Sequence, residues 1–224
     1  SLNKRMNKAF TKCKIIVANS KFTKKMASNL GVDVSKINVI NPGCYYPLEI
    51  SEDAKNQAKE VYGNSHPKII TVARLDPRKS HQNVLMTIKN LKVKFPKIKY
   101  ISIGDGEEKE KLIELRDELG LQNDALFVHK ADEQLKVALL NEAELLLMPS
   151  IVYKKSVEGF GISFIEAASY GIGSIGGIDG GEADAIIQNK TGYLCDGNNL
   201  NSIYENVVKY FEYDNYKAFG KNAL

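Results

Sequence analysis

Two carboxylates, Glu158 and Glu166, stand eight positions apart in the stretch SVEGFGISFIEAASYG, around Gly159, Phe160 and Gly161. The stretch follows the apolar run ELLLMPS, which indicates a buried strand, so the glycines lie where a strand gives way to a helix. The first turn of an α-helix leaves backbone N–H groups unpaired, and these groups favour an anion. The sequence therefore predicts an anion site, with Glu158 in the loop and Glu166 in the second turn of the helix.

A second loop supplies cations. The segment ARLDPRKS carries Arg74 and Lys79 directly after the predicted strand KIITVA. An Arg fork grips two phosphate oxygens and an ammonium adds a point charge, a combination that suits a pyrophosphate. The alternative is a pair of solvated surface cations. Carboxylates such as Glu158 and Glu166 accept hydroxyl protons, which suits the diol of a ribose or a hexose.

Two further loops are rich in glycine. The turn Gly104-Asp105-Gly106 permits close backbone approach, but GDGEEKE lacks the dinucleotide pattern G-x-G-x-x-G, which disfavours nicotinamide or flavin chemistry. In IGGIDGGEADAI, four glycines precede a predicted short helix with Glu182 at its start. Either the backbone is flexible near a ligand there or the segment is a loose connection.

The elements that must position these loops follow a regular alternation from Pro67 onwards. Runs of four to six apolar residues alternate with helical stretches, most of ten residues or more. This pattern predicts an α/β fold: a doubly wound, Rossmann-like parallel sheet of about six strands, covered on both faces. The predicted strands are 68–73, 99–106, 125–130, 144–150, 172–178 and 192–195, and the predicted helices include 81–95, 107–120, 132–143, 181–189 and 200–220. Ligands of such a sheet bind outside the carboxyl ends of the strands, where all the loops described above are expected.

The first part of the chain lacks this long alternation. Helical spacing over 2–13 is followed by a predicted strand over 14–20, a helix over 21–31 with Ser20 as its N-cap, and a short strand over 36–43. Residues 46–66 lose clear β periodicity, and their second half is polar and helical in character. We interpret this segment as a linker.

Composition narrows the functional class. The 224 residues are 43% hydrophobic and 26% charged with a net charge of +4, which is ordinary for a soluble globular protein. The lysines are dispersed and not interleaved with aromatic residues, so we expect no nucleic acid partner. Neither a signal peptide nor an uninterrupted apolar span is present, so we expect a cytoplasmic protein whose membrane contact, if any, is peripheral. Cys13, Cys44 and Cys195 are far apart, which predicts neither disulfides nor a metal site.

Taken together, these loops resemble the C-terminal, donor-binding domain of the GT-B retaining glycosyltransferases (family 4, or group 1). The matching pieces occur in the family's order over nearly the whole chain: ANSKFTKK, NVINPG, TVARLDPRKS, SIGDGEE, MPSIVYKKSVEGFGISFIEAASYG and GGIDGGEADAIIQNKTGYL. The resemblance implies a UDP- or GDP-sugar donor, a glycan or lipid-linked acceptor, retention of anomeric configuration and no separate cofactor.

The resemblance also implies a role for individual residues. Arg74 and Lys79 would hold the donor diphosphate, Glu158 would face the transferred sugar, and Glu166 would hold the ribose hydroxyls. The remaining positions of the implied donor site are Gly159, Phe160, Gly161 and Ile162, whose backbone N–H groups would contact the sugar or the phosphate, and the main chain near Val128, His129 and Lys130, which would line the base.

The sequence departs from the family in three places. Ser80 replaces the glycine that commonly follows the lysine, and Ile172-Gly173 replaces a proline-containing step. The first of the two GT-B domains is mostly missing: we assign 1–45 to its end, 46–66 to a linker and 67–224 to the donor-binding domain. We therefore expect a fragment or a truncated gene product. The alternative is a catalytically incomplete nucleotide-sugar-binding or assembly module. A flavodoxin-like signalling domain is disfavoured, because it would need acidic residues at the strand ends where this chain has cations.

Overall fold

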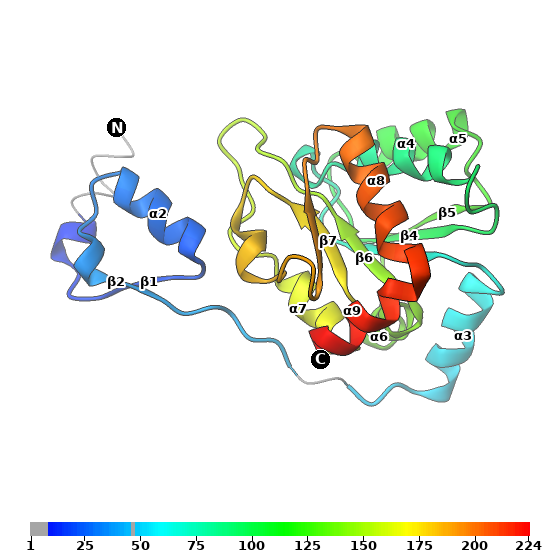
Figure 1. Cartoon of the computed structure of the whole chain (residues 1–224), viewed down its shortest axis with the longest axis horizontal. Helices are drawn as coiled ribbons and strands as arrows, with labels where there is room; N and C mark the ends of the chain where they lie inside the picture. Colours follow the sequence, from blue (N-terminus) through cyan, green and yellow to red (C-terminus); the bar gives the residue numbers. More distant parts are fainter. Residues whose placement is uncertain (1–8, 46–47) are drawn as a thin grey trace.

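A computed structural model describes residues 9–45 and 48–224 of the chain, which form a small N-terminal unit and a larger sheet domain (Figure 1). In the small unit, β1 (Ile16–Ala18) and β2 (Ile37–Val39) pair in parallel, with α2 (Lys21–Asn29) and the 3₁₀ turn η1 (Val34–Lys36) between them. Ser20 begins α2 through a reciprocal capping box with Thr23, as its position in the sequence predicts. The helix expected over 2–13 lies largely outside the described residues.

The large domain confirms the predicted fold class. Its six strands are all parallel and lie in the order β5-β4-β3-β6-β7-β8. They are β3 (Lys68–Val72), β4 (Lys99–Ile103), β5 (Ala125–Val128), β6 (Leu145–Met148), β7 (Ser174–Gly177) and β8 (Gly192–Cys195). The chain winds from β3 to one edge through β4 and β5, then returns to the centre at β6 and winds to the other edge. The order of a doubly wound sheet therefore reverses between β3 and β6.

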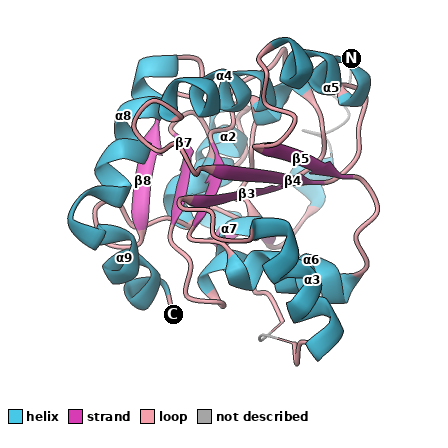
Figure 2. Cartoon of the chain, turned by 90° about the vertical axis from the view of Figure 1, so that its right-hand side faces the viewer, coloured by secondary structure: helices cyan, strands magenta, loops and turns pink. Residues whose placement is uncertain are grey.

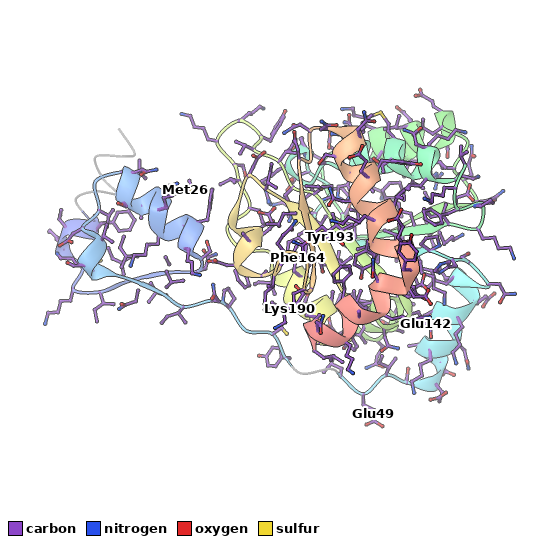
Figure 3. All side chains as sticks on the ribbon, in the orientation of Figure 1. Met26, Glu49, Glu142, Phe164, Lys190 and Tyr193 are labelled. Atoms are coloured by element: carbon purple, nitrogen blue, oxygen red, sulfur yellow. The ribbon has the colours of Figure 1, made fainter. Side chains whose placement is uncertain are left out.

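Helices cover both faces of this sheet (Figure 2). The helices on one face are α4 (His81–Leu91), α5 (Lys109–Glu118), α8 (Leu200–Phe211) and α9 (Asn215–Ala223), and those on the other are α3 (Glu52–Tyr62), α6 (Glu133–Glu142) and α7 (Ile162–Ala168). The adjacent strand residues Ile69 and Ile70 are both fully buried but belong to different core clusters, because successive side chains point to opposite faces. Tyr193 and Phe164, one from each cluster, are labelled in Figure 3.

The segment expected to be a linker contains a helix that packs as part of the domain. Ala54, Ala58 and Tyr62 of α3 are buried in the same core cluster as Ala138 and Leu139 of α6. Small alanines let α3 and α6 approach closely, and their spacing of four residues is that of one helix face. The sheet domain therefore includes α3 as well as the residues from Pro67 onwards.

Two predicted helices differ from the observed elements. The helix expected over 200–220 is broken between α8 and α9, where Tyr213 and Asp214 have φ values of 53° and 58°, outside the right-handed helical region. The helix expected over 181–189 is only the 3₁₀ turn η3 (Gly181–Asp184). The apolar spacing of both segments is helical, but local backbone geometry prevails over that spacing.

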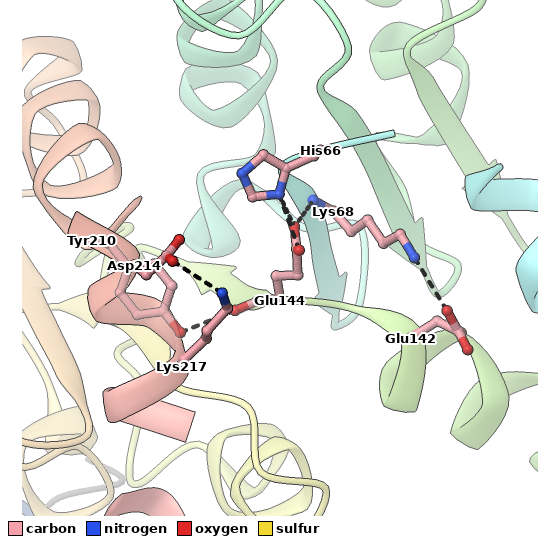
Figure 4. A network of polar contacts seen from close by, with 7 residues as sticks. All are labelled: His66, Lys68, Glu142, Glu144, Tyr210, Asp214 and Lys217. Atoms are coloured by element: carbon pink, nitrogen blue, oxygen red, sulfur yellow. Dashed lines mark hydrogen bonds and ion pairs between the residues drawn. The ribbon is translucent and has the colours of Figure 1, made fainter. Parts of the chain in front are cut away.

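At the amino edge of the sheet, Glu144 joins three elements (Figure 4). Its carboxylate accepts a hydrogen bond of 2.8 Å from the backbone N–H of Lys68, at the start of β3, and its Oε2 lies 2.9 Å from His66 Nδ1. The Tyr210 hydroxyl of α8 donates to the Glu144 carbonyl at 3.0 Å. This network ties β3, β6 and α8 together at the edge opposite to the predicted site.

Overpacking the contact between α3 and α6 should destabilise the whole domain. We expect Ala58→Leu to lower the free energy of unfolding by about 1–3 kcal/mol, because extra carbons cannot fit a closed helix contact. Asn56→Leu on the exposed side of α3 is the control, with an expected change within about 0.5 kcal/mol. Urea unfolding followed by circular dichroism measures both, and equal effects would show that α3 is not part of the folded core.

Candidate functional site

Two cations converge on one carboxylate where the sheet order reverses. Lys79 Nζ and Arg78 Nη1 both contact Oε2 of Glu158, the latter at 2.7 Å. Asp76 lies at the side of the cluster, with its Oδ2 3.8 Å from Arg78 Nη2. Lys79 is buried and Glu158 is partly buried, so these charges interact through a medium that screens them less than water does.

The backbone that follows β3 fixes the two cations. Pro77 begins the 3₁₀ turn η2 (Pro77–Lys79), where its fixed φ suits the first helical position. Ser80 then adopts the left-handed conformation, with φ 58°, that the family's usual glycine would adopt without strain. The Ser80 hydroxyl donates to the Gly197 carbonyl at 2.8 Å, which helps to hold this turn in place. Serine therefore occupies here a backbone conformation that favours glycine.

The electrostatics of the cluster favour an ionised Glu158. Burial raises the pKa of the Glu158 carboxyl, but the charges and hydrogen bonds of Lys79 and Arg78 outweigh burial and leave the pKa below its ordinary value. Burial likewise lowers the pKa of Lys79, and Glu158 partly offsets that effect. The two cations are thus balanced by Glu158 and, at a longer distance, by Asp76.

Arg74 lies outside this cluster. Its side chain is exposed, and in the described part of the chain it forms no ion pair. Its carbonyl lies 3.2 Å from Nε2 of the buried His81, whose pKa burial lowers to about 4. A neutral His81 can donate from Nε2, so the residue holds the loop rather than carrying charge. Arg78, which the sequence interpretation passed over, occupies the place beside Lys79; its only signal was a second cation in DPRKS.

Glu166 lies apart from the cluster of Lys79, Arg78 and Glu158, in the second turn of α7 as expected. It lines a cavity of ≈ 330 Å³. The other lining residues come from α6, from the turn after α7 and from the segment before α3: Cys44, Tyr45, Leu48, Glu133, Lys136, Val137, Leu140, Ser169 and Tyr170. Lys136 Nζ lies 3.7 Å from Glu166 Oε1, so this carboxylate also has a cation nearby. The cavity combines apolar walls with a few charged groups, as small-molecule sites commonly do.

The glycines after Glu158 shape the start of α7. Gly161 is its N-cap with φ 88°, and no side chain caps the helix there. Phe160 is buried and Ile162 is half exposed, so the backbone between them turns from the interior to the surface. Val128, His129 and Lys130 leave the end of β5 on the other side of the sheet centre. The His129 ring stacks on Phe127 with an interplanar angle of 1°, which is a packing role.

Comparison with known proteins places the chain in a family. The sequence profile described as "Glycosyl transferases group 1" matches residues 52–224, which is most of the chain and includes α3. The chain belongs to the group 1 glycosyltransferases. This result confirms the family that the loops resemble.

Curated relatives of this family act on different substrates. The GDP-mannose-dependent alpha-(1-6)-phosphatidylinositol monomannoside mannosyltransferase of Mycolicibacterium smegmatis is 27% identical over 154 residues, which cover 67% of this chain and 40% of the relative. The N-acetyl-alpha-D-glucosaminyl L-malate synthase of Bacillus anthracis is 26% identical over 175 residues, which cover 77% of this chain and 42% of the relative. The chain therefore spans about two fifths of the length of these relatives.

Solved structures of other proteins share the fold. Anabaena Alr3699/HepE, crystallised with UDP and glucose, superposes with a TM-score of 0.83 at 19% identity, over 99% of this chain and 60% of that one. The C-terminal domain of LpcC from Francisella tularensis superposes with a TM-score of 0.64 at 18% identity, over 80% of this chain and 91% of that domain. At such low identities the likeness establishes the fold alone.

Among the described residues, no helix is both long and apolar enough to cross a membrane. In the same residues, no group of three or more histidine, cysteine, aspartate or glutamate side chains is arranged to hold a metal ion.

A double-mutant cycle should reveal coupling between Lys79 and Glu158. We expect Lys79→Met and Glu158→Gln each to lower the free energy of unfolding by about 1–3 kcal/mol, because each leaves a poorly solvated partner charge. The double variant should cost less than the two single changes added together, with a coupling energy of about 1 kcal/mol or more.

The pH dependence of the free energy of unfolding supplies a second measurement on the same proteins. Because folding lowers the pKa of Glu158 below its ordinary value of 4.5, ionised Glu158 stabilises the fold in full above pH 4.5. This contribution is lost as the pH falls through the lowered pKa. Lys155→Met, which removes an exposed lysine from the same loop as Glu158, is the control. Strict additivity in the cycle would contradict the ion pair.

Proposed function

We propose that this chain binds the diphosphate of a nucleotide-sugar donor at Lys79 and Arg78, as the donor-binding part of a retaining glycosyltransferase. The observation that carries the proposal is the position of the cluster formed by Lys79, Arg78 and Glu158. The loop after β3 bears both cations and the loop after β6 bears the carboxylate. These are the two loops that diverge where the sheet order reverses, which is where open α/β sheets bind their ligands.

The charges of the cluster suit a diphosphate. An arginine fork and an ammonium together match several phosphate oxygens, and Arg74 stands exposed in the same loop as a further cation. The Glu158 carboxylate contacts the groups that a diphosphate would contact, so donor binding requires the cations to exchange one anion for another. Glu158 is then free to accept hydrogen bonds from the hydroxyl groups of the sugar that follows the diphosphate.

The nucleoside end of the donor has a separate place in this proposal. Glu166 lines the cavity between α6 and α7, and its carboxylate can accept hydrogen bonds from the two hydroxyl groups of a ribose. The main chain of residues 128–130 would approach the base. UDP and GDP are both reasonable probes, because Alr3699/HepE was crystallised with UDP and the mycobacterial relative uses GDP-mannose.

The transfer step itself follows from placing fixed charge on the leaving group. The acceptor hydroxyl, from a glycan or a lipid-linked acceptor, attacks the anomeric carbon while the bond to the diphosphate oxygen breaks, and the hydroxyl proton passes to the departing diphosphate. Negative charge develops on the departing diphosphate, and Lys79 with Arg78 stabilises it there. Because the chain spans about two fifths of its relatives, we propose turnover for a longer protein and donor binding for this chain.

Calorimetry with UDP, GDP, ADP and their sugars tests the diphosphate site. We expect Lys79→Ala to weaken the preferred nucleotide by about tenfold or more, because a charge-assisted contact is worth about 1.5–3 kcal/mol. Lys155→Ala removes the same charge from an exposed position near the site and should leave affinity within about twofold. Equal effects of the two variants would reduce the site to general electrostatic attraction.

The role of Glu166 has a separate test. We expect Glu166→Ala to weaken binding of the nucleotide by about tenfold, because a ribose hydroxyl would lose its charged acceptor. The corresponding 2′,3′-dideoxynucleotide should bind the natural protein and the variant equally well. An unchanged affinity of Glu166→Ala for every nucleotide would exclude the ribose role, and failure of the natural protein to bind any nucleotide would favour an assembly module.

A further inference from the structure

A second carboxyl group lies beneath the ion-pair cluster. Glu182, in η3, is 0% exposed, and neither of its oxygens has a hydrogen-bond partner among the described residues. Buried carboxyl groups are almost always paired, so an unpartnered one calls for a physical account. The sequence alone gave no sign of its burial, because Glu182 stands at the polar start of a predicted short helix.

A close backbone approach places Glu182 against Glu158. The Gly181 N–H donates to the Glu158 carbonyl at 2.9 Å, which joins the turn before η3 to the loop that carries Glu158. A Cβ added to Gly180 would lie 2.6 Å from that carbonyl and 2.5 Å from Glu182 Oε2. Only glycine fits between the two acidic residues, and the Glu182 side chain therefore packs directly behind the Glu158 backbone.

The groups that face Glu182 come from four elements. Glu158 approaches from the loop before α7 and Lys79 from η2, while Ser150 follows β6 and Cys195 ends β8. Ser150 lowers the pKa of Glu182, but its hydroxyl makes no hydrogen bond of acceptable geometry. Burial raises the pKa of the Cys195 thiol to about 12, so that neighbour stays uncharged. On η3 itself, Asp184 accepts from the backbone N–H of Lys21.

A carboxyl group in this position is mostly protonated near neutral pH. Ionising it would leave a negative charge away from solvent and without a hydrogen bond of acceptable geometry, which proteins avoid by keeping the proton. Burial is the main reason that the pKa of Glu182 rises to about 8; the negative charge of Glu158 adds to burial, whereas the backbone N–H of Glu182 and the charge of Lys79 oppose it.

We propose that Glu182 is an uncharged positioning residue for Glu158, and that loss of its proton weakens the binding of a diphosphate at Lys79 and Arg78. The second clause rests on the proposed function. While Glu182 holds its proton, the negative charges beside the two cations are those of Glu158 and Asp76. Once Glu182 ionises, a further negative charge competes for Lys79 and repels the diphosphate, so the donor site becomes weaker as the pH rises.

Nucleotide binding at two pH values tests the second clause. In this proposal the form with protonated Glu182 binds the nucleotide, and the fraction of that form falls about tenfold from about pH 7 to about pH 9. The affinity for UDP or GDP should therefore fall by about tenfold over the same range. Glu182→Gln keeps the shape and removes the titration, so its affinity should change much less over this range. The comparison cancels any loss of charge from Lys79 itself, because both proteins contain Lys79. Glu118→Gln, an exposed carboxyl on α5, should behave as the natural protein does.

Proton uptake provides a readout that a merely structural role would not change. At about pH 8, calorimetry in buffers of different ionisation enthalpy should show the natural protein taking up a fraction of a proton as it binds the nucleotide, and Glu182→Gln taking up much less. Equal proton uptake and parallel affinity profiles for the two proteins would overturn the coupling between Glu182 and the diphosphate site.

Unfolding without any nucleotide tests the first clause. The folded pKa of Glu182, about 8, lies above its ordinary value of 4.5, so its contribution to stability is complete below 4.5 and is lost as the pH rises through about 8. The melting temperature of the natural protein should therefore fall across this window relative to Glu182→Gln, which should be the more stable protein at about pH 8. Parallel profiles would overturn the uncharged Glu182 whatever the nucleotides do. Failure to bind UDP and GDP would instead overturn the proposed function.

Discussion

The parallel pairing of β3 with β6 is the constraint on which the rest of the structure depends. Ile69 pairs with Leu145 and Ile70 with Leu146, and the chain winds away from this pair in opposite directions. A slip of one residue would exchange the faces of every side chain on the strand, and the hydrogen bond from the Lys68 N–H to Glu144 opposes it at the amino edge. At the other edge, the same register sets the loops of Lys79 and Glu158 opposite each other.

The three glutamates discussed above, Glu158, Glu166 and Glu182, differ only in their surroundings. Glu158 meets two cations and is ionised, whereas Glu182 is fully buried, makes no hydrogen bond of acceptable geometry and keeps its proton. Glu166 is half buried at the wall of a cavity, within 3.7 Å of Lys136. Burial and neighbouring charge, rather than residue type, decide which of these groups offers charge, which holds a proton and which is accessible to a ligand.

The sequence was most informative where local pattern and final environment agree. Buried parallel strands are short apolar runs, so all six strands and the edge that carries the loops could be predicted from residues such as the LLLM of β6. The break at Tyr213 could not, because apolar spacing continues through it. Arg78 acquires its role from a contact with Glu158, 80 positions away in the chain. Glu182 acquires its role because the turn at Gly180 places it against Glu158. Spacing along the sequence carries no signal of such contacts.

The small N-terminal unit touches the sheet domain close to Glu158. The backbone N–H of Lys21 donates to Asp184, and Asn19 and Ser20 lie against Gly159 and Gly181, where an added Cβ would meet their side chains at 3.1 Å and 2.9 Å. The start of α2 and the Glu158 loop thus share one packed boundary. A rotation of the unit that shifts this loop would change the affinity of the two cations for Glu158. By thermodynamic reciprocity, an anion that displaces Glu158 from the cations would then shift the equilibrium between orientations of the unit by the same free energy.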